Sequence, residues 1–166
     1  MRYSFALLLL AAVTTFAAPQ RKSPTNVAEL FVTAENLEII RSADKIDACV
    51  LRYIAPPKDH SMREERYEET EFVLIADKDA SAMRAALLRD SNYDWDSAKG
   101  CWPRYHTRLR FHLKEKSVAI DFCFSCEILL IYRDGVAISG EDFEDHVFLE
   151  TMRKLFPDDV ALKKAK

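Results

Sequence analysis

The feature that most constrains the fold of this chain is a strict alternation of apolar and basic residues over positions 107–113. Its two faces carry different side chains: apolar Leu109, Phe111 and Leu113, and basic Arg108, Arg110 and His112. A period of two residues is typical of a half-buried β-strand. Further apolar runs follow at 117–124 and 128–132, too close together to enclose crossover helices. We therefore expect these runs to form an antiparallel sheet.

The apolar faces of the first two runs predict their register. Placing Phe111 opposite Ile120 matches apolar residues along both strands and sets Arg110 beside Asp121, a favourable cross-strand charge pair. A shift of one residue would bring charged side chains against apolar ones, so the alternation favours this register.

The second and third runs cannot form one strand. A strand over residues 117–132 would span roughly 53 Å at about 3.3 Å per residue, several times the usual length. We expect the chain to break at Phe124-Ser125. If it reverses there, Cys123 and Cys126 flank a two-residue turn within disulfide reach. If it only kinks, they point to different sides and have other partners. Both geometries remain open.

Periodicity and turn signals predict the remaining elements. The predicted helices cover 26–41, from 77 or 79 to 90, and from after Ser139 to Pro157. The predicted further strands cover 46–54, 72–75 and 136–138, the last after an Asp134-Gly135 hairpin turn. The charged segment 58–71 is expected to be a solvated loop or hairpin tip, and the tail from 163 to be frayed. These elements predict an α+β fold: an antiparallel sheet of about five strands with helices packed mainly on one face.

The first 18 residues have the pattern of a signal peptide. Arg2 provides the charged end, an apolar stretch follows, and Phe16-Ala17-Ala18 forms a small-residue cleavage site. We expect residues 19–166 to form a single α+β domain that is exported to the periplasm or the extracellular space. The apolar stretch is too short for a membrane span, so no integral membrane segment is expected in the mature chain.

The net charge bears on the class of partner. The formal net charge is −3, and it becomes one unit more negative when Arg2 is removed with the leader. General nucleic-acid binding requires a basic surface, so we expect no nucleic-acid partner. The expected partner is a protein or a small molecule, and no cofactor is expected.

Four cysteines, Cys49, Cys101, Cys123 and Cys126, remain after the leader. An even number in an exported chain favours disulfides, with three complete connectivities. One joins Cys123 to Cys126 and Cys49 to Cys101. Others join Cys101 to one member of the C-x-x-C motif and leave the other member for Cys49. The leading interpretation is that these bonds are structural.

Two alternatives assign chemistry to the same cysteines. A thiol–disulfide redox protein would exchange Cys123 and Cys126, and the predicted register places Arg108 beside Cys123, which favours a thiolate. Against it, redox pairs of the thioredoxin type precede a helix, whereas here strand-like sequence follows. A cysteine-based metal-binding module would need two further ligands, and a second close pair at zinc-site spacing is absent from the sequence.

Candidate ligand-binding residues fall into two groups. Arg108 and Arg110 share one strand face and could receive an anionic ligand; alternatively, this face is solvated and neutralised by Asp121 and Glu115. The loop 91–105 carries Trp95 and Trp102, which would form a ligand platform or cap one end of the core. No nucleophile-elbow, H-E-x-x-H or phosphate-loop pattern occurs, so no catalytic residue is assigned.

Three short features carry a resemblance: Cys101, Cys123-Phe124-Ser125-Cys126 and Leu155-Phe156-Pro157-Asp158-Asp159. Over its second half the chain resembles small exported bacterial proteins of unknown function. The resemblance implies a recurring domain architecture and supplies no activity or catalytic residue. Cys49 is not part of the pattern, which leaves its pairing open. Together, these observations predict an exported, non-catalytic binding or structural module stabilised by disulfides.

Overall fold

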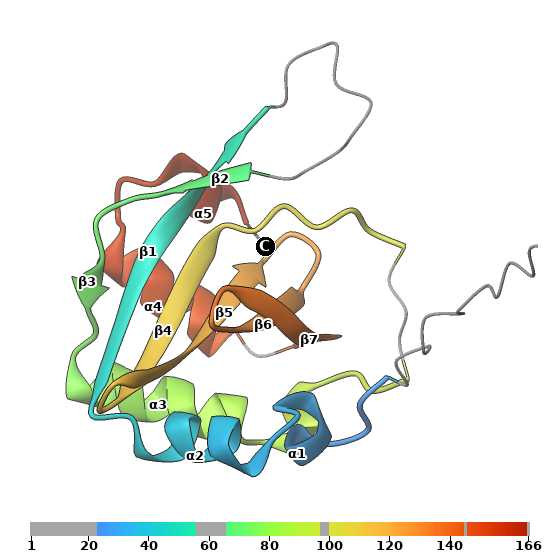
Figure 1. The fold of residues 1–166 in the computed structure, drawn as a ribbon. Coiled ribbons are helices and arrows are strands. Elements are labelled where there is room, and N and C mark those ends of the chain that lie inside the picture. The colour runs from blue at the N-terminus through green and yellow to red at the C-terminus, as the bar shows by residue number, and fades with distance from the viewer. Residues whose placement is uncertain (1–22, 56–65, 97–99, 145, 166) are drawn as a thin grey trace, which may run out of the picture.

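The computed structural model describes residues 23–55, 66–96, 100–144 and 146–165. The predicted signal peptide, residues 1–18, lies outside these ranges. In the described part, the chain forms a seven-stranded antiparallel sheet and five α-helices (Figure 1). The prediction of an α+β fold with an antiparallel sheet is confirmed, but the sheet has seven strands instead of about five.

The elements have the following bounds. The helices are α1 (Val27–Leu30), α2 (Ala34–Ser42), α3 (Asp77–Leu87), α4 (Val147–Leu155) and α5 (Val160–Lys164). The strands are β1 (Lys45–Ile54), β2 (Arg66–Glu69), β3 (Val73–Leu74), β4 (Thr107–Leu113), β5 (Lys116–Cys123), β6 (Ile128–Arg133) and β7 (Val136–Asp142).

The strands follow the order β2-β1-β4-β5-β6-β7, and β3 also pairs with β1. Strand β1 pairs with β4 along one edge and with β2 and β3 along the other. Strand β2 lies within the charged segment 58–71 and pairs with the end of β1, where Tyr67 lies opposite Tyr53. Aromatic cross-strand pairs of this kind stabilise a sheet, which accounts for a strand in so charged a sequence.

The predicted register of β4 and β5 is wrong by two residues. Phe111 lies opposite Val118, and Asp121 lies opposite Arg108 instead of Arg110. The connection is a tight turn at Lys114 and Glu115, with Lys114 at a φ of 56°. A shift of two residues preserves both faces, so the alternation does not distinguish the two registers. Consequently, Arg108 is not the cross-strand neighbour of Cys123.

The chain reverses after β5, as one of the two predicted geometries requires, but over four residues. The turn covers positions 124–127, and Cys123 pairs with Ile128 across it. Cys126 therefore lies within the turn and is not the cross-strand partner of Cys123. The next turn, at Asp134 and Gly135, has both φ angles positive (51° and 77°), as the predicted Asp-Gly hairpin turn requires.

The predicted first helix is two helices, α1 and α2. Asn26 caps α1 by accepting a hydrogen bond from the Glu29 N–H. The chain then leaves helical geometry at Val32, which has a φ of 67°. The Thr33 side chain begins α2 by accepting from the Asn36 N–H.

Two predictions near the C-terminus are wrong. Strand β7 continues through Ser139 to Asp142, because these residues pair with β6, and α4 begins only at Val147. The tail is not frayed as far as residue 165, where the described part ends: α5 continues through Lys164, and Ala165 is buried. Asp159 caps this helix through the Leu162 N–H.

The main core joins helix side chains to alternate residues of the strands. The strands contribute Leu109, Phe111, Val118, Ile120, Phe122 and Leu129 to this core. The helices contribute Leu30, Ile39, Ile40, Met83, Leu87 and Phe148. Helix α2 contacts β4 and β5, and α3 contacts α4. The other residues of the central strands are thereby left to form a second surface.

We expect Phe122→Ala to lower the free energy of unfolding by about 3–5 kcal/mol, because it would leave a cavity in the core. The Phe122 ring packs against those of Phe124, Phe143 and Phe148 at centroid distances of 5.8, 5.4 and 4.9 Å. Urea unfolding measures the loss. The control is Val136→Ala, at a 63% exposed side chain, with an expected change within about 0.5 kcal/mol. Equal losses in the two variants would contradict this core.

Candidate functional site

A second apolar cluster lies on the sheet face opposite the main core, here called the outer face. It consists of Cys49, Leu51, Tyr105, Cys123 and Cys126. Cys49 and Leu51 alternate along β1 with Ala48 and Val50, which belong to the main core. The alternation therefore buries both faces of β1 here, one beneath the helices' side chains and one beneath the loop that precedes β4.

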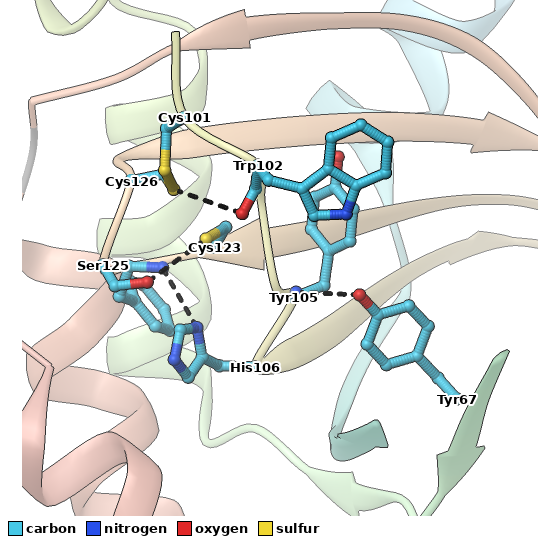
Figure 2. Close-up of a disulfide and its surroundings, with 9 residues drawn as sticks. Tyr67, Cys101, Trp102, Tyr105, His106, Cys123, Ser125 and Cys126 are labelled. Carbon is cyan, nitrogen blue, oxygen red and sulfur yellow. Dashed lines mark hydrogen bonds between the residues drawn. A yellow bond between two sulfur atoms is a disulfide. The ribbon is translucent and has the colours of Figure 1, made fainter. Parts of the chain in front are cut away.

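The disulfide between Cys101 and Cys126 ties that loop to the β5–β6 turn (Figure 2). The two cysteines are 25 residues apart in sequence, and their Cα atoms are 6.1 Å apart. The Sγ of Cys126 lies 3.9 Å from the carbonyl oxygen of Trp102. One predicted connectivity joined Cys101 to a member of the C-x-x-C motif, and this bond does so.

Hydrogen bonds anchor the two tethered segments further. The Tyr105 N–H donates to the Tyr67 hydroxyl at 3.3 Å, which connects the loop to β2. The Phe124 N–H donates to Nδ1 of His106 at 3.3 Å, which connects the turn to the residue before β4. Burial lowers the pKa of His106, so its ring is neutral at pH 7 and Nδ1 can accept. Both segments are therefore held at more than one point.

Cys49 and Cys123 are free thiols, and both are buried. No complete connectivity is realised, and the members of the C-x-x-C motif are not bonded to each other. Burial, chiefly, and the nearby Glu69 carboxylate raise the pKa of Cys49 to about 12. Cys49 therefore stays protonated at neutral pH and is a poor nucleophile. The Sγ of the other free thiol, Cys123, lies 3.5 Å from the Ser125 hydroxyl oxygen.

A cavity of about 450 Å³ opens on the outer face beside this cluster. Four aromatic side chains contribute to its lining: Tyr67, Trp102, Tyr105 and Tyr132. The charged residues in the lining are Glu69 and Arg108, and Leu51, Leu130 and Pro103 complete it. Such a combination of apolar walls with a few polar groups is characteristic of small-molecule sites.

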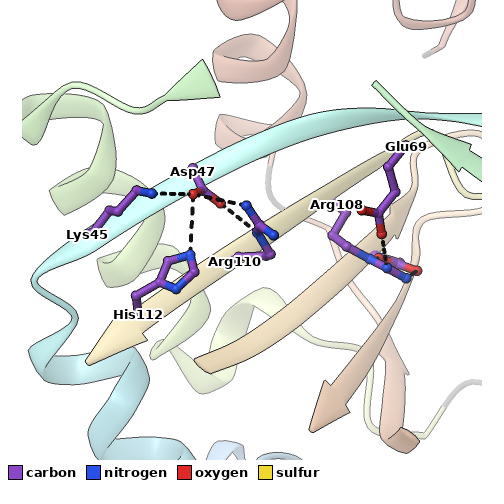
Figure 3. A network of polar contacts seen from close by, with 7 residues as sticks. Lys45, Asp47, Glu69, Arg108, Arg110 and His112 are labelled. Carbon is purple, nitrogen blue, oxygen red and sulfur yellow. Dashed lines mark hydrogen bonds and ion pairs between the residues drawn. The ribbon is translucent and has the colours of Figure 1, made fainter. Parts of the chain in front are cut away.

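Arg108 is the central charge of the cavity. Its Nε and Nη2 donate to the two carboxylate oxygens of Asp121 at 2.6 and 2.7 Å, and its Nη1 donates to Glu69 (Figure 3). The guanidinium also lies 5.0 Å from the centre of the Tyr132 ring. The Asp121 carboxylate raises the pKa of Arg108 further, while burial raises that of Asp121. One cation is thus held by two carboxylates.

A second ion-pair network lies further along the same face, centred on Asp47 (Figure 3). Asp47 is 2.8 Å from Nε of Arg110, 2.9 Å from Nζ of Lys45 and 3.3 Å from Nε2 of His112. Burial by itself would raise the pKa of Asp47, but hydrogen bonds from these groups outweigh it and lower that pKa. The Arg110 guanidinium lies 3.2 Å from the centre of the Phe72 ring.

The structure distributes the four candidate ligand-binding residues among three places. Arg108 and Trp102 meet at the cavity, and Arg110 lies beside it in the Asp47 network. Trp95 lies elsewhere: its ring packs on Tyr93 at 4.8 Å, and its N–H donates to the Asp90 carbonyl oxygen. Both arginines are paired with carboxylates, which leaves little excess positive charge for the anionic ligand considered from sequence.

The sequence reasoning missed Tyr67 and Glu69, which line the cavity from β2. The sequence predicts a solvated loop or hairpin tip over 58–71, whereas residues 66–69 form β2. The residues 66–69, Arg-Tyr-Glu-Glu, show no apolar–polar alternation, and the one signal for a strand is Tyr67, an aromatic residue of high β-propensity.

Comparison with known protein families, curated proteins and solved structures finds no match to this chain. Among the described residues, no group of three or more His, Cys, Asp or Glu side chains is placed to hold a metal ion. None of the helices formed by these residues has the length and apolar character needed to cross a membrane. Function is therefore inferred from the outer face itself.

We expect iodoacetamide at about pH 8 to modify neither Cys49 nor Cys123 in the native protein, and to modify both once it is unfolded without reductant. Both thiols are buried, and the raised pKa of Cys49 further suppresses its reaction. Peptide mapping by mass spectrometry reads out the labels and should find Cys101 bonded to Cys126. A native bond between Cys49 and Cys123 would contradict this arrangement.

We expect Asp47→Asn to lower the free energy of unfolding at pH 7 by about 1–3 kcal/mol, because it removes the buried charged acceptor that Lys45, Arg110 and His112 share. The folded-state pKa of Asp47 lies below its ordinary value of 3.8. Its contribution is therefore complete above that value and is lost as the pH falls through the folded-state pKa. Urea unfolding as a function of pH should show the difference between the two proteins shrinking below about pH 4. A pH-independent difference would contradict this role.

Proposed function

We propose that this protein is an exported, non-catalytic binding module whose ligand occupies the outer-face cavity. The observation that carries the proposal is the position of Trp102. This side chain is 64% exposed, yet it lines the cavity from a loop that a disulfide holds in place. Exposure of a large aromatic side chain is unfavourable, and such residues at the mouth of a cavity commonly serve binding.

The arrangement of the fold supports this proposal. In this proposal the helices cover mainly one face of the sheet and the ligand lies on the other, where the loop before β4 and residues of β1, β2, β4 and β6 line the cavity. A volume of about 450 Å³ is in the range of small-molecule sites. The ligand would enter a largely preformed site, because the disulfide and the Tyr105–Tyr67 hydrogen bond position the wall beforehand.

Export is the part of the proposal that depends on the sequence. The signal-peptide pattern of residues 1–18 and the resemblance to small exported bacterial proteins support it. A disulfide is compatible with it, because such bonds persist in oxidising compartments. In that compartment the bond would have a structural role, holding the loop that carries Trp102.

A thiol–disulfide function is the second candidate, and one observation favours it. The free thiol of Cys123 belongs to the same buried cluster as Cys126 of the disulfide. Attack of a Cys123 thiolate on the Cys126 sulfur would form a Cys123–Cys126 bond and release Cys101 as a thiolate. A mixture of both bonds in the peptide map would favour this candidate, and the Cys101–Cys126 bond alone favours the binding module.

We expect Trp102→Ala to weaken binding of N-phenyl-1-naphthylamine, a small neutral fluorescent probe, by about tenfold, because the cavity loses its most exposed aromatic wall. Reduction of the Cys101–Cys126 bond should also weaken binding of the probe, because it releases the loop that carries Trp102. Probe fluorescence during titration measures both effects. The control is Leu74→Ala, at a 64% exposed side chain outside the cavity lining. Binding that is equal in all these proteins would overturn the proposal.

A further inference from the structure

We propose that the outer-face cavity selects an organic cation, specifically a small quaternary ammonium group. This inference rests on the proposed function and adds the chemical class of the ligand. It follows from two properties of the lining: its charge balance and the number of its aromatic rings.

The charged side chains of the lining are Glu69 and Arg108, and the buried Asp121 beside Arg108 adds a second carboxylate. Arg108 contributes one positive charge, and it lies between the carboxylates of Asp121 and Glu69. Its Nε, Nη1 and Nη2 each donate to one of these carboxylates, so the guanidinium is already compensated. An anion entering here would meet the Glu69 carboxylate and an arginine that is already compensated, whereas a cation would be attracted by Glu69.

The two carboxylates have different positions relative to the ligand. Asp121 is only 1% exposed and lies beside Arg108, opposite it on the neighbouring strand β5. Glu69 is 39% exposed and belongs to the lining itself. Glu69 is therefore the carboxylate that a bound cation would contact, and Asp121 serves to hold Arg108 in position.

The aromatic lining suits the same class of ligand. The face of an aromatic ring attracts a cation through its negative electrostatic potential. Tyr132 already shows this interaction with the Arg108 guanidinium at 5.0 Å. The Tyr67 and Tyr105 rings are 6.1 Å apart and inclined at 67°, so they form a corner. With Trp102, this corner provides rings in several orientations around one space.

A quaternary ammonium fits the remaining walls better than a primary amine or a guanidinium. Its charge is spread over methyl groups and it has no N–H donors that need an acceptor when water is removed. Leu51 and Leu130 line the cavity with aliphatic carbon, which suits methyl groups and leaves an N–H unsatisfied. The lining therefore combines aromatic faces, aliphatic carbon and one accessible carboxylate.

Three probes of the same shape and different charge test this inference. They are choline, neutral 3,3-dimethylbutan-1-ol and anionic 3,3-dimethylbutanoate. Their binding to the full exported protein is measured by titration of tryptophan fluorescence. We expect choline to bind at least about tenfold more tightly than the neutral alcohol, and the anion to bind most weakly.

A matched pair of variants assigns the charge effect to the cavity. Glu69→Gln removes the accessible carboxylate, and Glu68→Gln removes the same charge from the neighbouring residue of β2, outside the lining. We expect choline binding to weaken several-fold in Glu69→Gln and to remain unchanged in Glu68→Gln. Binding of the neutral alcohol should be the same in both, which distinguishes a lost charge from a disturbed fold.

The possible outcomes separate this inference from the proposed function. Equal or tighter binding of the alcohol or the anion would overturn the selection of a cation and leave the binding module standing. The selection of a cation would also be overturned, and the binding module left standing, if none of the three probes binds while N-phenyl-1-naphthylamine still binds in a Trp102-dependent manner. If that dye also fails to bind, both proposals are wrong.

Discussion

The pairing of β4 with β1 on one side and β5 on the other is the constraint on which both halves of the molecule depend. Because side chains alternate along a strand, this one segment places Leu109 and Phe111 in the main core and Arg108 on the outer face. Residues of the core and of the cavity therefore share one backbone. A substitution that displaced β4 would disturb stability and binding together.

The outer face combines buried charge with a covering loop. The Arg108–Asp121 pair costs desolvation, which its two hydrogen bonds and the Glu69 contact offset. The Cys101–Cys126 bond constrains the unfolded chain, a contribution on the order of 3 kcal/mol in the loop-entropy model. It also sets the position of Trp102. The same bond thus links the stability of the fold to the shape of the proposed site.

Part of this fold follows directly from local patterns. The alternation over 107–113 corresponds to β4 residue for residue, and the Asp134-Gly135 turn is present. The β4–β5 register was missed by two residues, because such a shift keeps every side chain on its face and the turn at Lys114 decides between the registers. The end of β7 was missed because pairing with β6 outweighs the helix-start signal at Ser139.

By itself, the sequence determined which residues share a strand face, that four cysteines are present, and that Arg108 and Trp102 are candidates for a site. Only the tertiary structure decided that Cys126 bonds to Cys101, that Cys49 and Cys123 remain thiols, and that Glu69 joins Arg108. The physical reason is distance along the chain. Periodicity reports the direction of a side chain relative to its own backbone, whereas these contacts depend on which strands become neighbours and on the segments that cover them.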